Sequence, residues 1–293
     1  MKPLIDVVTL LQAKLANGTK AEQSLAAVIL DDLPGASSSS IAALAKKAGV
    51  SEPTVTRLAT SLGLDGTREL KIALAQAIAI GGAYLSSEGE PISLGEHSSI
   101  GTISNSAIRT INEVSEILND ELVETIAKAL AGADKIQILG TGGISSMAAE
   151  LTEFRLFRLG FNLTTRLDGR LQRMTASLAN TSTVVIGFSL SGAASSVVDS
   201  FNIARQYGAQ TIAIAPPDTP LARCAHIVVP YRYVEDGQVY KPNSASFALM
   251  TIIDIIAYRT TQILGPEIVD NLRRIKQTLT IAEDYDSTLP LGD

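Results

Sequence analysis

Apolar residues recur at helical spacing throughout the first eighty residues, and no alternating strand pattern interrupts them. Three groups show this spacing: Leu25, Val28 and Ile29; then Ile41, Leu44, Ala45 and Ala48; then Val55, Leu58 and Leu62. A further helical stretch is predicted from residue 67 to 80. The pattern therefore predicts an all-α region over residues 1–80.

The second and third apolar groups are joined by a short turn. Gly49 and Val50 separate them, Ser51 is placed to cap the next helix, and Pro53 falls in its first turn, where a missing N–H costs nothing. Two short helices joined in this way have the spacing of a helix-turn-helix motif.

The outward face of the second helix of this motif carries groups that can read DNA. With the third apolar group turned inward, the pattern places Thr54, Thr56 and Arg57 outward near the N-terminal end, which meets base edges in a major groove. Threonine can bond a base edge, and arginine can bind guanine with two hydrogen bonds. The alternative is that two packed helices simply present ordinary polar faces. The candidate DNA-binding residues are Ser51, Thr54, Thr56, Arg57, Lys46, Lys47 and Arg68.

Residues 81–104 differ in composition from what precedes them. The stretch is rich in glycine and serine, contains one proline and shows no clear apolar period. These features are typical of a linker between domains. We therefore expect domains at 1–80 and 105–293.

From residue 105 onward, short apolar runs alternate with segments of helical length. A helical run is predicted to about residue 131 and a long helix over 146–159. The predicted strands are 135–139, 162–165, 183–187, 210–215 and 226–229. Alternation of this kind predicts an α/β domain with a doubly wound parallel sheet, which binds ligands beyond the carboxyl ends of its strands.

Two loops follow strand ends and lead into helices, at residues 140–146 (GTGGISS) and 188–196 (FSLSGAASS). Backbone N–H groups at a helix start, with small hydroxyl side chains beside them, can bind an anion such as phosphate. Neither loop has the dinucleotide pattern G-x-G-x-x-G or the lysine of a P-loop. The pair therefore favours a small phosphorylated molecule over a nucleotide, unless glycine and serine serve only as loop and cap residues.

Charge is divided unevenly along the chain. Residues 1–80 hold eight Lys or Arg against seven Asp or Glu, and the other 213 residues hold sixteen against twenty-three. The N-terminal region is thus the better partner for a polyanion, but it is not a strongly basic arm. DNA binding would then need a shaped reading element and more than one copy per complex, so we expect a homodimer or homotetramer.

Other bulk features indicate a cytoplasmic protein without a membrane span. The 18% charged and 46% hydrophobic contents are ordinary for a globular protein. The N-terminal residues lack the order of basic, apolar and small residues that marks a secretory signal. The single cysteine, Cys224, has no partner in the chain. The apolar segments 70–85 and 247–264 are too short or too charged to span a membrane, and 247–264 is our candidate oligomer interface.

Several stretches together resemble RpiR-type bacterial transcriptional regulators. They are Ser40–Arg57 (SIAALAKKAGVSEPTVTR), Glu69–Gln76 (ELKIALAQ), Phe154–Gly160 (FRLFRLG) and Ser189–Gly192 (SLSG). The resemblance covers nearly the whole chain. It implies a helix-turn-helix domain joined to a sugar isomerase (SIS) domain, in an oligomeric regulator of sugar or carbon catabolism that binds double-stranded operator DNA and senses a sugar phosphate.

The same resemblance implies which residues hold the effector. Ser189 and Ser191 would hold its phosphate, together with a serine from the first loop. Counting back from R-L-G identifies this serine as Ser145, whereas counting forward from the strand puts Ile144 at its position. The family's loop is commonly S-x-S-G-x-T, but Ala193 and Ala194 stand here, so one hydroxyl is missing unless Ser195 or Ser196 replaces it. The candidate effector-binding residues are Gly142, Ser145, Ser189, Ser191, Gly192 and Ser195.

Catalysis finds little support in the sequence. An aldose–ketose isomerase of this fold would need a carboxylate or histidine to move a proton, whereas His97 falls in the predicted linker and His226 at the start of a strand. Glu150 and Glu153 lie on a predicted helix, where a charged face is common. No cluster has metal-ligand spacing, and we expect no metal or cofactor. The alternative is a sugar-phosphate isomerase with an accessory DNA-binding domain.

Overall fold

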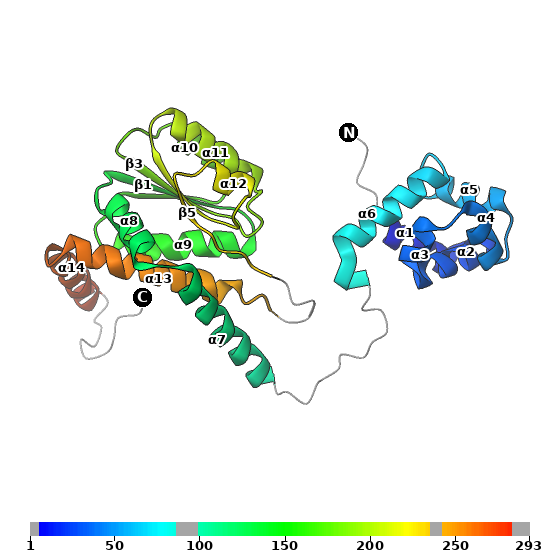
Figure 1. Ribbon diagram of the computed structural model, residues 1–293, viewed down its shortest axis with the longest axis horizontal. Helices are drawn as coiled ribbons and strands as arrows, with labels where there is room; N and C mark the ends of the chain where they lie inside the picture. The colour runs from blue at the N-terminus through cyan, green and yellow to red at the C-terminus, as the bar shows by residue number, and fades with distance from the viewer. Residues whose placement is uncertain (1–5, 86–98, 235–241, 283–293) are drawn as a thin grey trace. The chain divides into compact units, whose positions relative to one another are not determined.

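The computed structural model describes residues 6–85, 99–234 and 242–282. Within these residues the chain divides into two compact units, one built from helices α1 to α6 and the other from a sheet with helices α7 to α14 (Figure 1). An all-helical N-terminal domain and a doubly wound α/β domain are both confirmed.

The first unit is a bundle of six helices around one core. Leu25, Ile29, Leu44, Val55 and Leu58 from the predicted apolar groups are all buried in it. Its helices are α1 (Val7–Asn17), α2 (Lys20–Asp31), α3 (Leu33–Ser38), α4 (Ile41–Ala48), α5 (Glu52–Ser61) and α6 (Thr67–Leu85).

The turn between α4 and α5 forms as the sequence predicts. The Ser40 hydroxyl accepts a hydrogen bond from the Ala43 N–H and starts α4. Gly49 ends the helix in the left-handed conformation, with φ 66°, where its N–H bonds back to the helix. Pro53 lies in the first turn of α5, so the missing N–H leaves no helical bond unmade.

Two helix boundaries differ from the prediction. Helix α6 continues past residue 80 through Gly81 to Leu85, and α7 (Ser99–Ile117) begins inside the predicted linker. A glycine costs a helix interior only about 1 kcal/mol, which is too little to end it alone. The single run predicted to residue 131 is two helices, because Asn119 caps α8 (Asp120–Ala131) by accepting the Leu122 N–H at 2.8 Å.

The sheet of the second unit has five parallel strands in the order β2-β1-β3-β4-β5. All five predicted strands are confirmed, with small shifts at their ends. Their bounds are β1 (Lys135–Gly140), β2 (Leu163–Arg166), β3 (Thr183–Phe188), β4 (Gln210–Ile214) and β5 (Ile227–Val229). The order of strands reverses between β1 and β3, and in doubly wound sheets ligands bind at such a point.

Helices cover both faces of the sheet (Figure 1). On one face, α8, α9 and α13 pack over Ile136 and Ile138 of β1, and on the other α10, α11 and α12 pack over Leu139. The remaining helices are α9 (Gly143–Phe157), α10 (Gly169–Ala176), α11 (Ser195–Gln206), α12 (Pro220–Arg223), α13 (Ala245–Leu264) and α14 (Glu267–Ala282).

Helix α13, the predicted oligomer interface, is mainly a core helix. Among the described helices it alone is long and apolar enough to cross a membrane by length and composition. Seven of its residues, including Leu249 and Ile252, are buried within the chain. Most of its hydrophobicity is therefore explained by packing on the sheet, and only residues such as Met250 and Tyr258 remain exposed.

Candidate functional sites

The N-terminal half of α5 presents the expected reading surface in part. Thr56 and Arg57 are exposed, and with Ile41, Glu52 and Pro53 they line an open hollow on the surface of this unit. Lys46 and Lys47 at the end of α4, and Arg68 at the start of α6, are exposed as well. These side chains are therefore accessible to a nucleic acid.

Thr54 does not face outward as predicted. It is only 9% exposed, because it lies one helical turn before the buried Leu58 and therefore shares its inward face. Its hydroxyl instead accepts a hydrogen bond from the Arg57 guanidinium at 3.1 Å. Thr54 thus holds the Arg57 guanidinium and is itself hardly accessible at the surface.

Ser51 occupies the predicted N-cap position but does not cap the helix. Its backbone is extended, yet its hydroxyl lies 2.9 Å from the Thr54 hydroxyl and makes no cap bond to a backbone N–H. The first N–H groups of α5 are therefore left without a side-chain partner, and helix N-termini of this kind bind phosphate.

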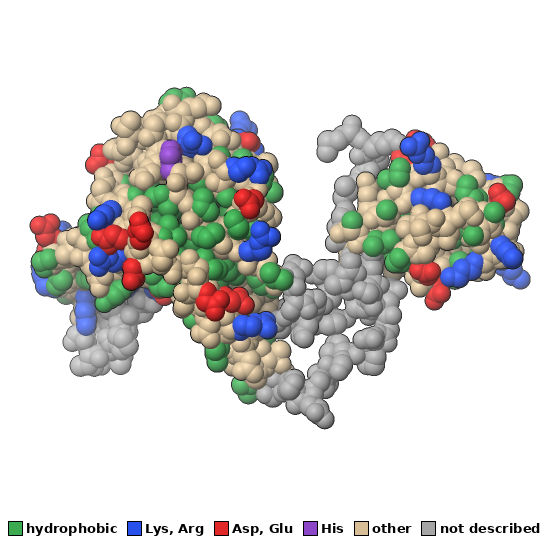
Figure 2. All heavy atoms as spheres, viewed as in Figure 1, with side chains coloured by type: hydrophobic (Ala, Val, Ile, Leu, Met, Phe, Trp, Pro, Cys, Tyr) green, Lys and Arg blue, Asp and Glu red, His purple; other side chains and the backbone are tan. Residues whose placement is uncertain are grey.

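The basic residues of this surface are weakly paired. Lys47 lies 3.9 Å from the Asp32 carboxylate, and both side chains are about half exposed, so the pair contributes little. On the second unit, charges of both signs are mixed over the face seen in Figure 2. The visible surface there offers no single basic patch of the kind that a polyanion prefers.

The two predicted ligand loops lie side by side at the point where the strand order reverses. Gly140 at the end of β1 is paired with Phe188 at the end of β3, so the loops that follow start from neighbouring positions. One loop runs into α9 and the other into α11. The structure thus brings the two candidate sets together at one edge of the sheet.

The second loop is a compact turn of serines. The hydroxyls of Ser189, which is buried, and Ser191, which is exposed, are 3.4 Å apart. Ser191 Oγ accepts the Ala193 N–H at 3.2 Å, which leaves the hydroxyl proton available for a ligand. Gly192 has a φ of 64°, and a Cβ built on it would lie 2.1 Å from Thr219 Oγ1, so this turn requires glycine.

The first loop is shorter than its sequence suggests, because α9 already begins at Gly143. Gly142 precedes it with a φ of 85°, and Ser145 lies buried in the first turn of the helix. Ile144 is half-buried against the apolar core. Of the two residues that the counts reach, Ser145 carries a hydroxyl in the first turn of α9, and Ile144 packs on the core.

Helices α9 and α11 begin without a side-chain cap, as α12 and α13 also do, whereas α8 and α10 are each capped by the residue before them. Asp168, for example, accepts the N–H groups of Arg170 and Leu171 at the start of α10. In the described residues, no side chain caps either helix that starts at the paired loops. Their first N–H groups are free to bind an anion.

Sequence reasoning missed a second polar group beneath the loops. Thr141 Oγ1 lies 3.2 Å from Ser196 Oγ and 2.9 Å from the Gln172 side-chain nitrogen. Ser196 is thus turned toward the first loop, and only Ser195 of the two replacement candidates is exposed. The signal that could have revealed Gln172 is its position on the buried face of α10, which it shares with Thr175 and Ala176 although its side chain is polar.

Other polar residues serve the fold. His226 Nδ1 accepts the Thr211 N–H at 3.1 Å between β4 and β5, and burial, followed by the Arg205 charge, lowers its pKa. Glu150 is exposed and Glu153 half-buried on α9, while His97 lies outside the described residues. Within the described part of the chain, no three His, Cys, Asp or Glu side chains are placed to hold a metal ion.

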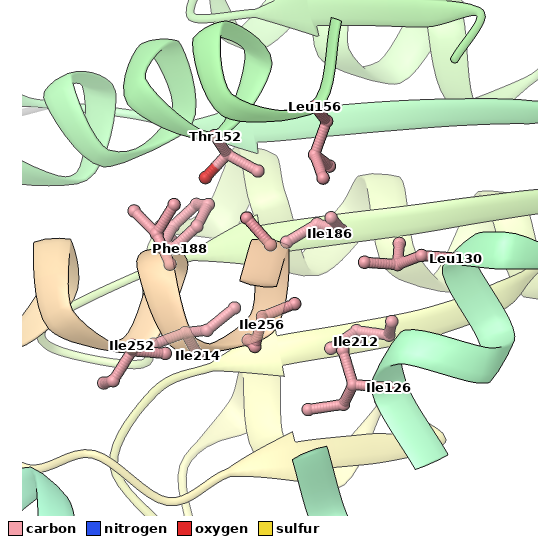
Figure 3. A pocket seen from close by; sticks show the side chains of 12 residues that line it. Ile126, Leu130, Thr152, Leu156, Ile186, Phe188, Ile212, Ile214, Ile252 and Ile256 are labelled. Carbon is pink, nitrogen blue, oxygen red and sulfur yellow. The ribbon is translucent and has the colours of Figure 1, made fainter. Parts of the chain in front are cut away.

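A small cavity lies elsewhere, under the sheet between α8, α9 and α13 (Figure 3). Its volume is about 20 Å³, and its lining is apolar. The one hydroxyl there, on Thr152, donates to the Ala148 carbonyl oxygen at 2.7 Å. A water would fit but would find no partner, so this cavity is a packing gap and not a ligand site.

Comparisons with known proteins match both units. A helix-turn-helix domain of the rpiR family matches residues 5–81, and a SIS domain matches residues 129–257. The chain is 31% identical over 279 residues to the HTH-type transcriptional regulator HexR of Pseudomonas aeruginosa, covering 95% of this chain and 96% of that protein. It is 32% identical over 286 residues to HexR of Escherichia coli, covering 97% of each.

A solved structure shares the fold. The Vibrio vulnificus NanR protein complexed with ManNAc-6P matches 94% of this chain and 99% of its own, with a TM-score of 0.59 and 18% identity. At that identity the likeness concerns the fold alone. The two domain matches and the two full-length regulators carry the assignment: the chain belongs to the RpiR family of DNA-binding transcriptional regulators, a helix-turn-helix domain followed by a SIS domain.

Proposed function

We propose that this protein regulates sugar or carbon catabolism by binding operator DNA, and that a sugar phosphate bound at the two paired loops controls that binding. One observation carries the effector site: α9 and α11 start side by side without side-chain caps, next to the Ser189 and Ser191 hydroxyls. Neutral donors held by the fold can bind a phosphate with little reorganisation.

The residues have distinct roles in this proposal. Ser189 and Ser191 donate hydroxyl hydrogens to the phosphate, and the first backbone N–H groups of α9 and α11 complete the cradle. Ser145 lies in the first turn of α9, and the exposed Ser195 in the first turn of α11, where its hydroxyl can replace the one missing at Ala194.

The helical unit, assigned to residues 1–80, binds the operator as double-stranded DNA. Arg57, held by Thr54, reads a base edge, and the exposed Thr56 lies beside it. Lys46, Lys47 and Arg68 contact phosphates, and the start of α5 offers N–H groups to another. Residues 81–104 connect it to the sensor domain of residues 105–293.

Two copies or more bind one operator. Helices α9 and α13 pack together, and the Arg155–Asp254 ion pair, at 2.8 Å, joins them. Their outer surfaces leave several large apolar side chains exposed: Met147, Phe154, Phe157, Met250 and Tyr258. This pair of helices replaces α13 alone as our candidate interface of a homodimer or homotetramer in the cytoplasm, with half-sites about 34 Å apart or a multiple of that.

Light scattering tests this assembly. A dimer or larger species is expected at micromolar concentration, and Phe157→Glu should shift it toward monomers because a charge would be buried at the contact. A wild-type monomer would contradict the assembly, and an unchanged Phe157→Glu oligomer would move the interface elsewhere.

The protein acts as a sensor and not as an isomerase in this proposal. No carboxylate or imidazole is assigned to a substrate carbon, and the two glutamates of α9 are treated as surface charges. Incubation with glucose 6-phosphate and with fructose 6-phosphate should therefore leave each compound unchanged. Interconversion of the two would establish the isomerase alternative.

A thermal-shift panel tests the effector class. It contains glucose 6-phosphate, fructose 6-phosphate, N-acetylmannosamine 6-phosphate and 6-phosphogluconate, each beside its unphosphorylated parent. A compound at a hundred times its dissociation constant should stabilise the protein by about 2.7 kcal/mol. Stabilisation by a phosphorylated compound and not by its parent is expected, and equal responses to both would contradict the phosphate site.

A further inference from the structure

Gln172 is completely buried and connects three parts of the ligand-binding edge. Its side-chain nitrogen donates to the Gly140 and Arg166 carbonyl oxygens, each at 3.0 Å, and lies 2.9 Å from Thr141 Oγ1, whose hydroxyl donates to the Gln172 side-chain oxygen at 3.3 Å. Gly140 ends β1 and Arg166 ends β2, while Gln172 itself belongs to α10. One amide group therefore holds the ends of two strands and the first ligand loop.

The chemistry of this contact requires a hydrogen-bond donor. Two carbonyl oxygens face the side-chain nitrogen, so the group must be the NH₂ and not the oxygen of the amide. A carboxylate in the same place would put oxygen against oxygen. The paired registers of β1 and β2 end here, and Gln172 closes the gap where the strands separate toward their helices.

The contact continues to the second ligand loop. Thr141 Oγ1 also lies 3.2 Å from Ser196 Oγ, in the first turn of α11. Gly169 at the start of α10 approaches the same serine so closely that a Cβ there would lie 2.8 Å from Ser196 Cβ. The starts of α9, α10 and α11 are therefore held together through Gln172, Thr141 and Ser196.

We propose that Gln172 is a positioning residue for the effector, which sets the separation of the two phosphate-binding loops through the Thr141 and Ser196 hydroxyls. The proposal rests on the effector site described under Proposed function. Gln172 is buried and does not touch the effector. Its role is to keep the free N–H groups of α9 and α11 aimed at one point, so that a single phosphate can bind both.

The chain contains a matched control for this residue. Gln137 of β1 is also completely buried, and its side-chain nitrogen donates to the Thr175 carbonyl oxygen of the same helix at 2.9 Å. That bond holds α10 on the sheet but touches neither ligand loop. Gln172→Met and Gln137→Met each remove a buried amide of the same size, but only Gln172→Met also removes the bonds to the first ligand loop and to the end of β2.

Calorimetric titration of the full-length protein with inorganic phosphate, and with the four sugar phosphates of the panel, tests the proposal. Gln172→Met should weaken binding at least tenfold for every compound that wild type binds, while Gln137→Met should stay within about twofold. Equal losses in both variants, or no loss in Gln172→Met, would overturn the positioning role and leave the effector site intact. If wild type bound none of the five compounds, the site and the proposal would fall together.

Variants at the exposed Thr141 keep the test decisive if Gln172→Met does not fold. Thr141→Val removes the hydroxyl at almost unchanged shape, and Thr141→Ser keeps it. We expect Thr141→Val to weaken binding of the phosphate compounds at least threefold, and Thr141→Ser to bind them as wild type does. Equal affinity of both variants and wild type would show that the connection does not matter.

Discussion

The two surfaces that we propose to bind phosphate differ in their chemical groups. On the helical unit, exposed cations with few fixed partners surround α5, and Lys47 reaches its nearest acid only at 3.9 Å. On the α/β unit, the paired loops have neutral hydroxyls and backbone N–H groups, fixed by short hydrogen bonds to buried residues such as Gln172.

The difference follows from the two kinds of phosphate. A DNA backbone is a repeating polyanion, so mobile side chains with net charge can bind it at any sequence and release counterions. A single small effector brings one phosphate, and neutral donors already in place bind it without a large ordering cost. Changes to the backbone should therefore harm the loops most, whereas changes of charge should act mainly on the helical unit.

The largest effect is expected for Gly192→Ala. The new Cβ would meet Thr219 at 2.1 Å and would force a left-handed conformation on alanine, so the protein should lose about 2–5 kcal/mol of unfolding free energy. Gly142→Ala is the control, since it is strained in φ but has open space around the new Cβ and should cost about 1–3 kcal/mol. Denaturant unfolding measures both, and a smaller loss for Gly192→Ala would contradict the close approach.

Ser191→Ala should act on the effector alone. Removing a hydrogen bond to a charged phosphate costs about 1.5–3 kcal/mol, which is roughly a ten- to hundredfold loss of affinity for the sugar phosphate. Effector-free operator affinity should stay near wild type, because the serine lies in the other unit. Calorimetry and a DNA-binding assay separate the two, and unchanged effector affinity would remove Ser191 from the cradle.

Arg57→Ala should act on the operator alone. Loss of its base contact should weaken specific binding by about 1–3 kcal/mol without unfolding the protein, since the side chain is exposed. Thr54→Val should cost less, about 0.5–1.5 kcal/mol, because it removes only the hydroxyl that orients Arg57. Equal losses for operator and random DNA would show that Arg57 contacts a phosphate and not a base.

Lys46→Gln should weaken binding to all DNA sequences alike. Each lost phosphate contact should lower the slope of log affinity against log salt by about 0.9. Titrations at several salt concentrations measure that slope, and Glu150→Gln on the other unit serves as the control. An unchanged slope in Lys46→Gln would place this lysine away from the DNA.

The smallest effect concerns Glu22 in the helical unit. The Lys14 ammonium, bonded at 2.7 Å, together with the Thr19 N–H lowers the pKa of this carboxyl to about 2. Because the folded pKa lies below the ordinary value of 4.5, Glu22 stabilises the protein fully above that pH and loses its effect as the pH falls toward 2. The melting temperatures of wild type and Glu22→Gln should therefore converge on acidification, and a gap independent of pH would refute this.

The sequence predicted the strands and both loops because short apolar runs and glycine–serine turns are local signals. The role of Thr54 was also within reach, since it stands four residues before the inward Leu58. The buried face of α10 could reveal Gln172 as a polar core residue but not its role, because its partners Gly140 and Thr141 are some thirty residues away and meet it only through the sheet order. The division between α7 and α8 was missed because an apolar period continues across the cap at Asn119.

In the proposed mechanism, a phosphate bound at the serine loop of the α/β unit changes the DNA affinity of the helical unit. Operator fragments selected with the purified protein allow a direct test, in which operator affinity is measured against increasing sugar phosphate and against its unphosphorylated parent. In wild type the phosphorylated compound alone should change operator affinity, and Ser191→Ala should need ten- to a hundredfold more of it. An identical response to both compounds, or an identical response in wild type and Ser191→Ala, would contradict the claim.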